Sequence, residues 1–378
     1  MTDVLVVGDT ERVPELRHEV PLMIPDPFFY AERDGRRLVA VPSLEAPRLE
    51  ALGAGLEVYP YEELGVDELL RAGLDPYTFR GELAKRVVRG LGIEQAAVPR
   101  AFPLGVADEL RGIGVKLTVD QELFDARRRV KSEHELAGIR RAQRAAEAAM
   151  AEARDLLRRA EPQDGLLALD GEPLTCELVK ERVRATLLRH GAFSDTPIVS
   201  HGAQTAVGHE LGSGPIAASD VVLLDLFPQD LESACFADLT RTFVVGEAPA
   251  ELRRAHDLCL EALELALGGI RAGVNGGDLH RRVCAFFGEH GYPTQLTKAE
   301  GEVLRDGFFH GLGHGVGLAV HEAPSLGLVG QELVAGDVVA IEPGLYRHGL
   351  GGVRVEDLVL VTDDGCEVLT EFPYDLEV

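Results

Sequence analysis

The chain has 378 residues, of which 46% are hydrophobic and 27% charged, and its formal net charge is -25 at pH 7. This length predicts two domains, because a single hydrophobic core rarely serves so many residues. The negative charge argues against nucleic acid or an anionic membrane as a partner, because both are bound through clustered Lys and Arg. The five cysteines lack CxxC spacing, and the N-terminus lacks a basic and then apolar leader, so we expect a reduced cytoplasmic protein.

Short apolar stretches alternate with helical segments over the first third of the chain. Residues 4–7 and 38–41 are strand-like, and residues 81–92 have helical character, which together predict one small α/β domain. Residues 131–160 are rich in Glu, Arg, Ala and Leu and contain almost no Gly or Pro, which predicts a long helix. The domain boundary is expected just before this helix.

The predicted boundary divides the chain into a first domain, residues 1–128, and a second domain, residues 129–378. In the second domain we expect further helices at residues 175–190 and 251–270. Its strand-like runs are residues 221–227, 239–245, 338–341 and 353–361. Helices and strands interleaved in blocks predict a mixed α+β domain.

Two aspartates lie on neighbouring predicted strands. Asp225 sits in an apolar run, where a buried carboxylate needs a charge partner or a metal; the alternative is an Asp that caps a turn at the strand end. Asp238 shares a strand face with Thr240 and Thr242, because alternate residues of a strand point to the same side. Antiparallel pairing would bring the two carboxylates together, although a hairpin with two solvated Asp residues is at least as common. Asp230, between them, is a competing candidate.

Three histidines fall in a glycine-rich segment that reads HGLGHGVGLAVHE. His310 and His314 are four residues apart, which on a helix would suggest a zinc pair. Four glycines between residues 311 and 317 make a helix unfavourable, since each costs about 1 kcal/mol relative to Ala. The segment therefore predicts an extended backbone that comes close to a ligand. A lone His is more often a satisfied core or surface residue, but His310, His314 and His321 together favour a site.

Two glutamates complete the set of candidate ligands. Glu342 ends an apolar strand and is followed by Pro and Gly, which terminate the run. Arg354 and Glu356 lie two residues apart and are expected on one face of a single strand, where the alternative is a solvated ion pair. Four carboxylates and one imidazole form an oxygen-rich set that suits manganese, cobalt or iron(II) better than a tetrahedral structural zinc. Four negative ligands also exceed the need of one divalent ion, so we expect two.

These segments together resemble those of the pita-bread metallopeptidases, which include aminopeptidase P, prolidase and methionine aminopeptidase. The resemblance covers essentially the whole chain. The N-terminal domain and the sequence RVKSE at residues 129–133 are similar to the prolidase and aminopeptidase P branch. The resemblance implies an α+β pita-bread (creatinase/aminopeptidase) catalytic domain, preceded by a smaller α/β creatinase/prolidase-type domain.

The resemblance also implies a role for each candidate residue. Asp225 would chelate one ion, Asp238 and Glu356 would bridge both, and His314 and Glu342 would complete the other. The cofactor would be two divalent metal ions per chain, manganese first, with cobalt, iron and zinc as alternatives. The residues implied to face the substrate are His209, His310 and His321, and Arg354 would stand near the bridging glutamate.

The implied reaction is hydrolysis of the Xaa-Pro peptide bond at the N-terminus of dipeptides or short peptides. Glu342 would transfer the proton, and His321 and His209 would stabilise the oxyanion. Some prolidases carry an arginine after the His-Glu-x-Pro segment to hold a dipeptide carboxylate, but no arginine occurs here between His321 and Glu342. We therefore expect acceptance of longer peptides, or a basic residue from the N-terminal domain of a second subunit in a homodimer.

Two other functions are compatible with such a fold. A metal-free creatinase-like amidinohydrolase would lack the carboxylate ligands, and a non-catalytic peptide-binding module would have degenerate ones. All five candidate ligands are present in this sequence. The metallopeptidase interpretation is therefore preferred to both.

Overall fold

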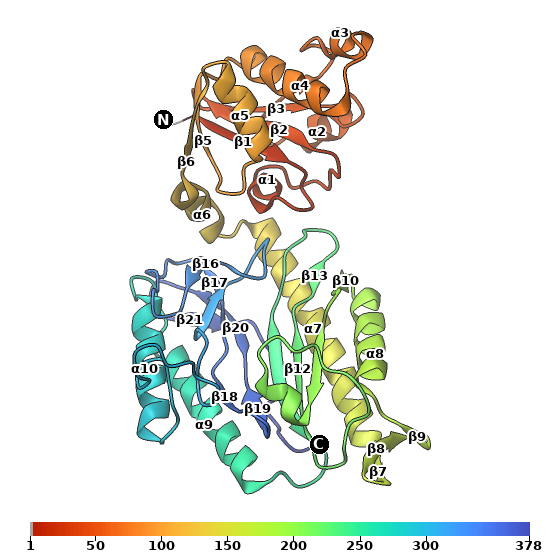
Figure 1. The fold of residues 1–378 in the computed structure, drawn as a ribbon, viewed down its shortest axis with the longest axis vertical. Coiled ribbons are helices and arrows are strands. Elements are labelled where there is room, and N and C mark those ends of the chain that lie inside the picture. The colour runs from red at the N-terminus through yellow and green to blue at the C-terminus, as the bar shows by residue number, and fades with distance from the viewer. Residues whose placement is uncertain (1–2) are drawn as a thin grey trace. The chain divides into compact units, whose positions relative to one another are not determined.

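The computed structural model describes residues 3–378 and shows two compact units, Met1–Arg128 and Arg129–Val378 (Figure 1). Each unit has its own hydrophobic core. Within residues 3–378, none of the helices combines the length and apolar character needed to span a bilayer.

The first unit is built on one six-stranded sheet with the order β4-β3-β2-β1-β5-β6. The two pairs β1–β2 and β2–β3 are antiparallel, whereas β3–β4, β1–β5 and β5–β6 are parallel. Its strands are β1 Val4–Gly8, β2 Phe28–Arg33, β3 Arg36–Val41, β4 Leu56–Pro60, β5 Gln95–Val98 and β6 Lys116–Val119. Its helices are α1 Pro14–Glu19, α2 Ala46–Leu52, α3 Val66–Arg71, α4 Pro76–Gly90, α5 Leu104–Gly112 and α6 Gln121–Arg129, which ends across the unit boundary.

Strand β1 shows how this sheet is buried on both faces. Val4 and Val6 belong to one hydrophobic cluster, and Leu5 and Val7 belong to another. Alternate residues of a strand point to opposite faces, so an uninterrupted apolar run fits a strand that is covered on both sides. The apolar runs noted in the sequence thus mark the centre of the sheet.

Four long helices frame the second unit. The predicted helix at residues 131–160 is confirmed as α7 Glu133–Arg159, which begins with a capping box formed by Ser132 and Glu135. The helices predicted at residues 175–190 and 251–270 are confirmed as α8 Cys176–Arg189 and α9 Ala250–Leu267. Helix α10 Gly276–Glu289 was not predicted from the sequence, because the two glycines at its start lower helix propensity.

Short strands of the second unit form several small sheets between these helices. One sheet has the order β11-β12-β14, another β16-β15-β17-β20-β21, and β18 pairs with β19. The small pairings are β10-β13 and β7-β8-β9, and residues 202–206 form a 3-10 turn. The strand bounds are β7 Glu161–Gln163, β8 Leu166–Leu169, β9 Glu172–Pro173, β10 Ala192–Phe193, β11 Ile198–His201, β12 Val221–Leu226, β13 Gln229–Asp230, β14 Leu239–Val244, β15 Gly313–Gly315, β16 Glu322–Ser325, β17 Val338–Ile341, β18 Gly344–Arg347, β19 Gly351–Arg354, β20 Asp357–Val361 and β21 Cys366–Val368.

The helices cover the outer faces of these sheets. Apolar residues of α7 and α8 form one cluster with β11, β12 and β14, and those of α9 and α10 form another with β17, β19 and β20. Figure 1 shows the two helix pairs on opposite sides of the strands within this unit. The inner strand faces between the two layers are therefore available for polar side chains.

The strand predicted at residues 353–361 is wrong in one respect, because the chain forms two strands there. β19 pairs with β18 and β20 pairs with β17, while Val355 and Glu356 lie between them. The Val355 amide donates to the Pro343 carbonyl and the Glu356 amide to the Thr240 carbonyl. These bonds turn the backbone from one sheet to the next, so Glu356 is carried by a crossing point that strand periodicity does not anticipate.

Arg241 stabilises this crossing point through buried polar contacts with Glu356 and Asp357. Its side chain is among the largest that are fully buried, and it pairs with Asp357, which is also buried. The guanidinium also donates to the backbone carbonyls of Glu356, Phe372 and Pro373 at 2.6 to 2.9 Å. One buried cation therefore joins β14, the start of β20 and the C-terminal segment.

Replacing Arg241 by Met should destabilise the second unit by about 3 to 5 kcal/mol, because Asp357 would remain buried without its cation. Calorimetry on the full chain measures this as a lower melting temperature for that unit. Arg241→Met combined with Asp357→Asn should be milder, because no unpaired charge remains. A single variant that melts like the wild type would contradict the structural role of this pair.

Candidate metal centre and active site

One cavity of about 770 Å³ in the second unit brings together every site residue expected from the sequence. Its walls come from β11, β12, β15 and β19 and from the loops beside these and other strands. The expected residues that line it are His209, Asp225, Asp238, His310, His314, His321, Glu342, Arg354 and Glu356. Phe227 and Phe309 add apolar surface to the same walls.

A β-hairpin sets the two aspartates side by side. In the antiparallel pair of β12 and β14, Asp225 stands opposite Thr240, and Asp238 lies two residues before Thr240. Residues two apart share a face, so both carboxylates point into the same space. Asp230, the competing candidate, instead accepts from the Arg141 guanidinium at 2.8 and 3.0 Å and from Ser233. It ties the hairpin to α7.

His314 is brought to the carboxylates by a strand that only glycines permit. A Cβ on Gly313 would stand 1.9 Å from the Ala340 carbonyl oxygen, and one on Gly315 would stand 2.2 Å from the Ala323 carbonyl oxygen. The extended backbone expected for this segment is confirmed as β15. The His314 Nδ1 donates to the Gly315 carbonyl at 3.1 Å, so the neutral ring leaves Nε2 unprotonated.

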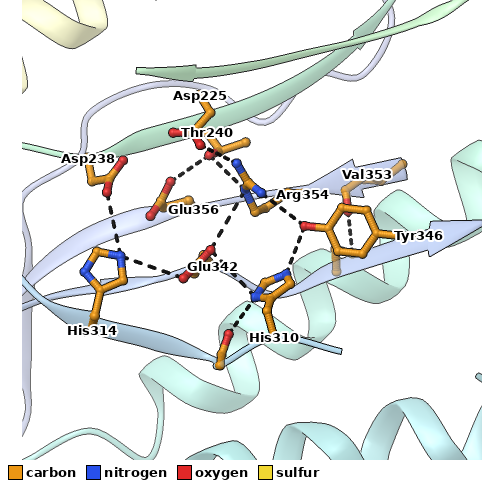
Figure 2. A network of polar contacts seen from close by, with 12 residues as sticks. Asp225, Asp238, Thr240, His310, His314, Glu342, Tyr346, Val353, Arg354 and Glu356 are labelled. Atoms are coloured by element: carbon orange, nitrogen blue, oxygen red, sulfur yellow. Dashed lines mark hydrogen bonds and ion pairs between the residues drawn. The ribbon is translucent and has the colours of Figure 1, made fainter. Parts of the chain in front are cut away.

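The free Nε2 of His314 faces two carboxylates. It lies 3.8 Å from Asp238 Oδ2 and 3.8 Å from Glu342 Oε1 (Figure 2). One donor atom each from Asp238, His314 and Glu356 lies within 4.8 Å of the others. Too far apart for direct hydrogen bonds, these atoms converge as the ligands of one cation do.

The carboxylates of this cluster carry more negative charge than the nearby protein neutralises. Burial, followed by the charges of its neighbours Glu356, Asp225 and Glu342, raises the pKa of Asp238. Burial also raises the pKa values of Glu356 and Glu342. The buried Oδ1 of Asp238 lacks a hydrogen-bond partner within the described part of the chain. A buried oxygen without a hydrogen-bond partner, among carboxylates whose pKa values are raised, fits a site for a divalent cation.

Arg354 is the cation that the protein itself places beside these carboxylates. Its guanidinium pairs with Asp225 Oδ2, and its Nε donates to Thr240 Oγ1 at 3.1 Å. Thr240 in turn donates to Glu356 Oε2 at 2.7 Å, so one hydroxyl links the arginine to the glutamate (Figure 2). Arg354 Nε is 4.0 Å from Glu342. The arginine thus fixes the orientation of Asp225 and, through Thr240, that of Glu356.

Tyr346, a residue not predicted from the sequence, extends this network to His310. Arg354 Nη1 donates to the Tyr346 hydroxyl at 3.2 Å, and that hydroxyl is 2.9 Å from His310 Nε2. His310 Nδ1 donates to the Gly311 carbonyl at 2.7 Å, so Nε2 of the neutral ring accepts from Tyr346. With both nitrogens engaged, His310 offers ring carbons to the cavity. The one sequence feature that could have indicated Tyr346 is its position four residues after Glu342.

His321 stands beside the carboxylate cluster. Its ring packs edge to face on His314 with 4.2 Å between centroids. Desolvation lowers the pKa of His321 to about 4, with further lowering by His314 and His209. The ring is therefore neutral at pH 7 and presents one N–H and one free nitrogen. A neutral donor at the edge of the cavity suits contact with a developing negative charge.

Comparison with known proteins identifies the family. The sequence pattern of metallopeptidase family M24 matches residues 137–363, more than half of the chain. The chain belongs to metallopeptidase family M24. An M24 metallopeptidase is a hydrolase that works with divalent metal ions, and the donors of Asp238, His314 and Glu356 suit such an ion.

Two relatives of this M24 metallopeptidase are named Xaa-Pro dipeptidases. It is 30% identical to the Xaa-Pro dipeptidase of Pyrococcus horikoshii over 288 residues, or 74% of each chain. It is 35% identical to the Xaa-Pro dipeptidase of Pyrococcus furiosus over 176 residues, which is 46% of this chain and 47% of the relative. The solved X-Pro aminopeptidase of Thermotoga maritima has a TM-score of 0.78 at 24% identity, covering 99% of this chain and 97% of that one. This last likeness shows that the fold is the pita-bread fold.

The metal-free protein should lose stability as the pH rises. The folded pKa values of Asp238, Glu342 and Glu356 are raised above their unfolded values of 3.8 and 4.5, so their contribution is fully present below about pH 4 and is lost as the pH passes the folded values. The loss is about 1.4 kcal/mol per pH unit for each group. Melting temperatures of chelated protein across pH measure it.

Asp238→Asn is the matched control for this pH dependence. The substitution removes one of the carboxylates with a raised pKa. The metal-free variant should therefore lose stability less steeply between pH 4 and pH 8 than the metal-free wild type. Carboxylates elsewhere in the chain affect both proteins equally. Identical slopes for the two proteins would show that the cluster does not carry the excess charge assigned to it.

Proposed function

We propose that this protein hydrolyses the peptide bond between an N-terminal residue and a following proline in short peptides. The observation that carries the proposal is the buried group of four carboxylates and one imidazole in a single cavity of an M24 metallopeptidase. The relatives named Xaa-Pro dipeptidase support the proline specificity. The unit Arg129–Val378 holds the whole cavity and would be the catalytic domain.

The proposed cofactor is a pair of divalent ions, with manganese first and cobalt, iron or zinc as alternatives. The ligands would be Asp225, Asp238, His314, Glu342 and Glu356. Four oxygen donors and one nitrogen donor favour manganese over a tetrahedral zinc site. When bound, such a pair supplies Lewis acidity and a water of lowered pKa.

The side chains around the ligands would perform the remaining steps. Glu342 would hold the proton that the prolyl nitrogen receives when the peptide bond breaks. His321 and His209, which line the same cavity, would donate to the carbonyl oxygen as negative charge develops on it. Arg354 would act by holding Asp225 and Thr240 in place. The ring carbons of His310 would contact the apolar part of the substrate.

The cavity indicates which peptides the enzyme accepts. Among the described residues its lining contains one arginine, Arg354, and no lysine, and Arg354 is already paired with Asp225. A dipeptide would place its free carboxylate there without a cation, which is unfavourable when buried. We therefore propose that the enzyme cleaves peptides longer than two residues. We also propose a homodimer, in which a second subunit would contribute the missing cation. The five free cysteines favour a cytoplasmic location.

His321→Ala and His314→Ala should have different effects. His321→Ala should keep its metal and lower kcat by about 10²-fold or more, the usual scale for loss of an oxyanion or proton-transfer group. His314→Ala should lose metal, because a ligand is removed. Metal analysis and steady-state kinetics with a Xaa-Pro tripeptide measure both. Equal metal loss in the two variants would refute the division of roles.

Peptide length can be tested directly. The value of kcat/KM for a Xaa-Pro dipeptide should be lower than for the same peptide extended by one residue, since the extension replaces the carboxylate at proline by a neutral carbonyl. Amidation of the dipeptide is the matched control and should restore activity without adding length. Molecular mass by light scattering gives the assembly. A monomer that cleaves dipeptides alone would overturn both the length preference and the dimer.

A further inference from the structure

Among residues 3–378, the backbone bonds that hold the loop carrying His321 lie mainly near the beginning of the loop. Residues 316–321 connect β15 to β16. Within this loop the Val316 amide donates to the Val338 carbonyl at 2.8 Å and the Gly317 amide to the Ala319 carbonyl at 3.1 Å. The Phe236 amide donates to the Gly317 carbonyl at 2.7 Å. His321 is the last residue of the loop, so its position depends on what fixes the end next to β16.

The side chain of the following residue, Glu322, organises this loop from within. One carboxylate oxygen accepts the Ala319 amide at 3.3 Å, and the other pairs with Lys131 Nζ. The side chains of Lys131 and Glu322 are 3% and 2% exposed, so water does not replace either contact. A Cβ on Gly317 would stand 2.5 Å from Glu322 Oε1, which explains why glycine occupies that position. The loop is wrapped around a buried carboxylate.

Lys131 is itself anchored by the segment in which it lies. Its neighbour Arg129 donates from Nε to Asp337 Oδ1 at 2.9 Å and from Nη2 to the Glu332 carbonyl at 2.6 Å. Asp337 is fully buried and directly precedes β17. On the other side, Ser132 caps α7. A lysine fixed between an ion pair and a helix cap gives Glu322 a partner of defined position.

We propose that Lys131 is a positioning residue for His321, acting through the buried carboxylate of Glu322. Without the ammonium group, the Glu322 carboxylate would be buried without a compensating charge. The loop would then rearrange to bring this carboxylate to water or to another donor. The His321 ring would then leave its edge-to-face contact with His314. A displacement of about 1 Å at a catalytic group reduces turnover severely. The inference rests on the proposed function for the catalytic role of His321, but the placement of the ring is a separate question.

A double-mutant cycle separates positioning from general stability. Lys131→Met should lower kcat at least tenfold while KM and metal content stay near wild type, because the metal ligands are not moved. In the His321→Ala background the same substitution should have no further effect on kcat, since the group it positions is gone. An equal fold loss of kcat in both backgrounds would overturn the proposal. Lys131→Arg keeps the positive charge and should retain most of the turnover.

The position of His321 is also measurable without activity. In metal-free protein labelled at histidine, the ring signals of His321 are assigned by their loss in His321→Ala. Lys131→Met should shift these signals and leave unchanged those of His256, which lies on α9 and does not line the cavity, whereas Lys131→Arg should leave both near wild type. Unmoved His321 signals in Lys131→Met would overturn the proposal even if Xaa-Pro hydrolysis is established. A shift together with failure of Xaa-Pro hydrolysis would refute the proposed function and leave the positioning role supported.

A variant that lacks both charges serves as the control for a folding defect. If Lys131→Met alone does not fold, Lys131→Met combined with Glu322→Gln leaves no unpaired charge, and its amide oxygen still accepts from Ala319. This pair should fold, with lower kcat and shifted His321 signals, because the cation that fixes residue 322 is absent. Wild-type kcat and wild-type His321 signals in the folded pair would show that Lys131 serves stability alone.

Discussion

An excess of buried negative charge is the constraint on which the site depends. Asp225, Asp238, Glu342 and Glu356 line one cavity, and among the described residues of its lining Arg354 is the one arginine, with no lysine. One cation leaves the carboxylates undercompensated, which raises the pKa of Asp238, Glu342 and Glu356 through burial and mutual repulsion. A divalent ion relieves this repulsion and stabilises the arrangement.

Buried polar contacts in the surrounding fold hold the four carboxylates in place against their mutual electrostatic repulsion. Arg241 and Asp357 form a buried ion pair behind the point where Glu356 lies between two strands. Thr240 links Glu356 to Arg354, and the capped helix α7 begins next to Lys131. Each support is a buried polar contact with a partner, and each costs stability if only one member is removed. Catalytic geometry and fold stability therefore rest on the same contacts.

Residue chemistry predicted much of the site, and long-range contacts limited the rest. Alternation along β12 and β14 predicted that Asp225 and Asp238 share a face, and glycine density predicted the extended strand of His314. Local patterns did not reveal the crossing between β19 and β20, which depends on the Thr240 carbonyl 116 residues away. They equally missed the pair of Lys131 with Glu322, which are 191 residues apart, since separation along the chain carries no periodic signal.

Diffraction from crystals grown with manganese tests the central claim that this acidic cluster is a metal centre. Data collected near the manganese absorption edge would give anomalous peaks at the metal positions. The account predicts two peaks in the cavity, enclosed by Asp225, Asp238, His314, Glu342 and Glu356, and their absence in crystals of the Asp238→Asn variant. Manganese bound to other side chains, with the cluster closed by direct hydrogen bonds between its own carboxyl groups, would contradict it.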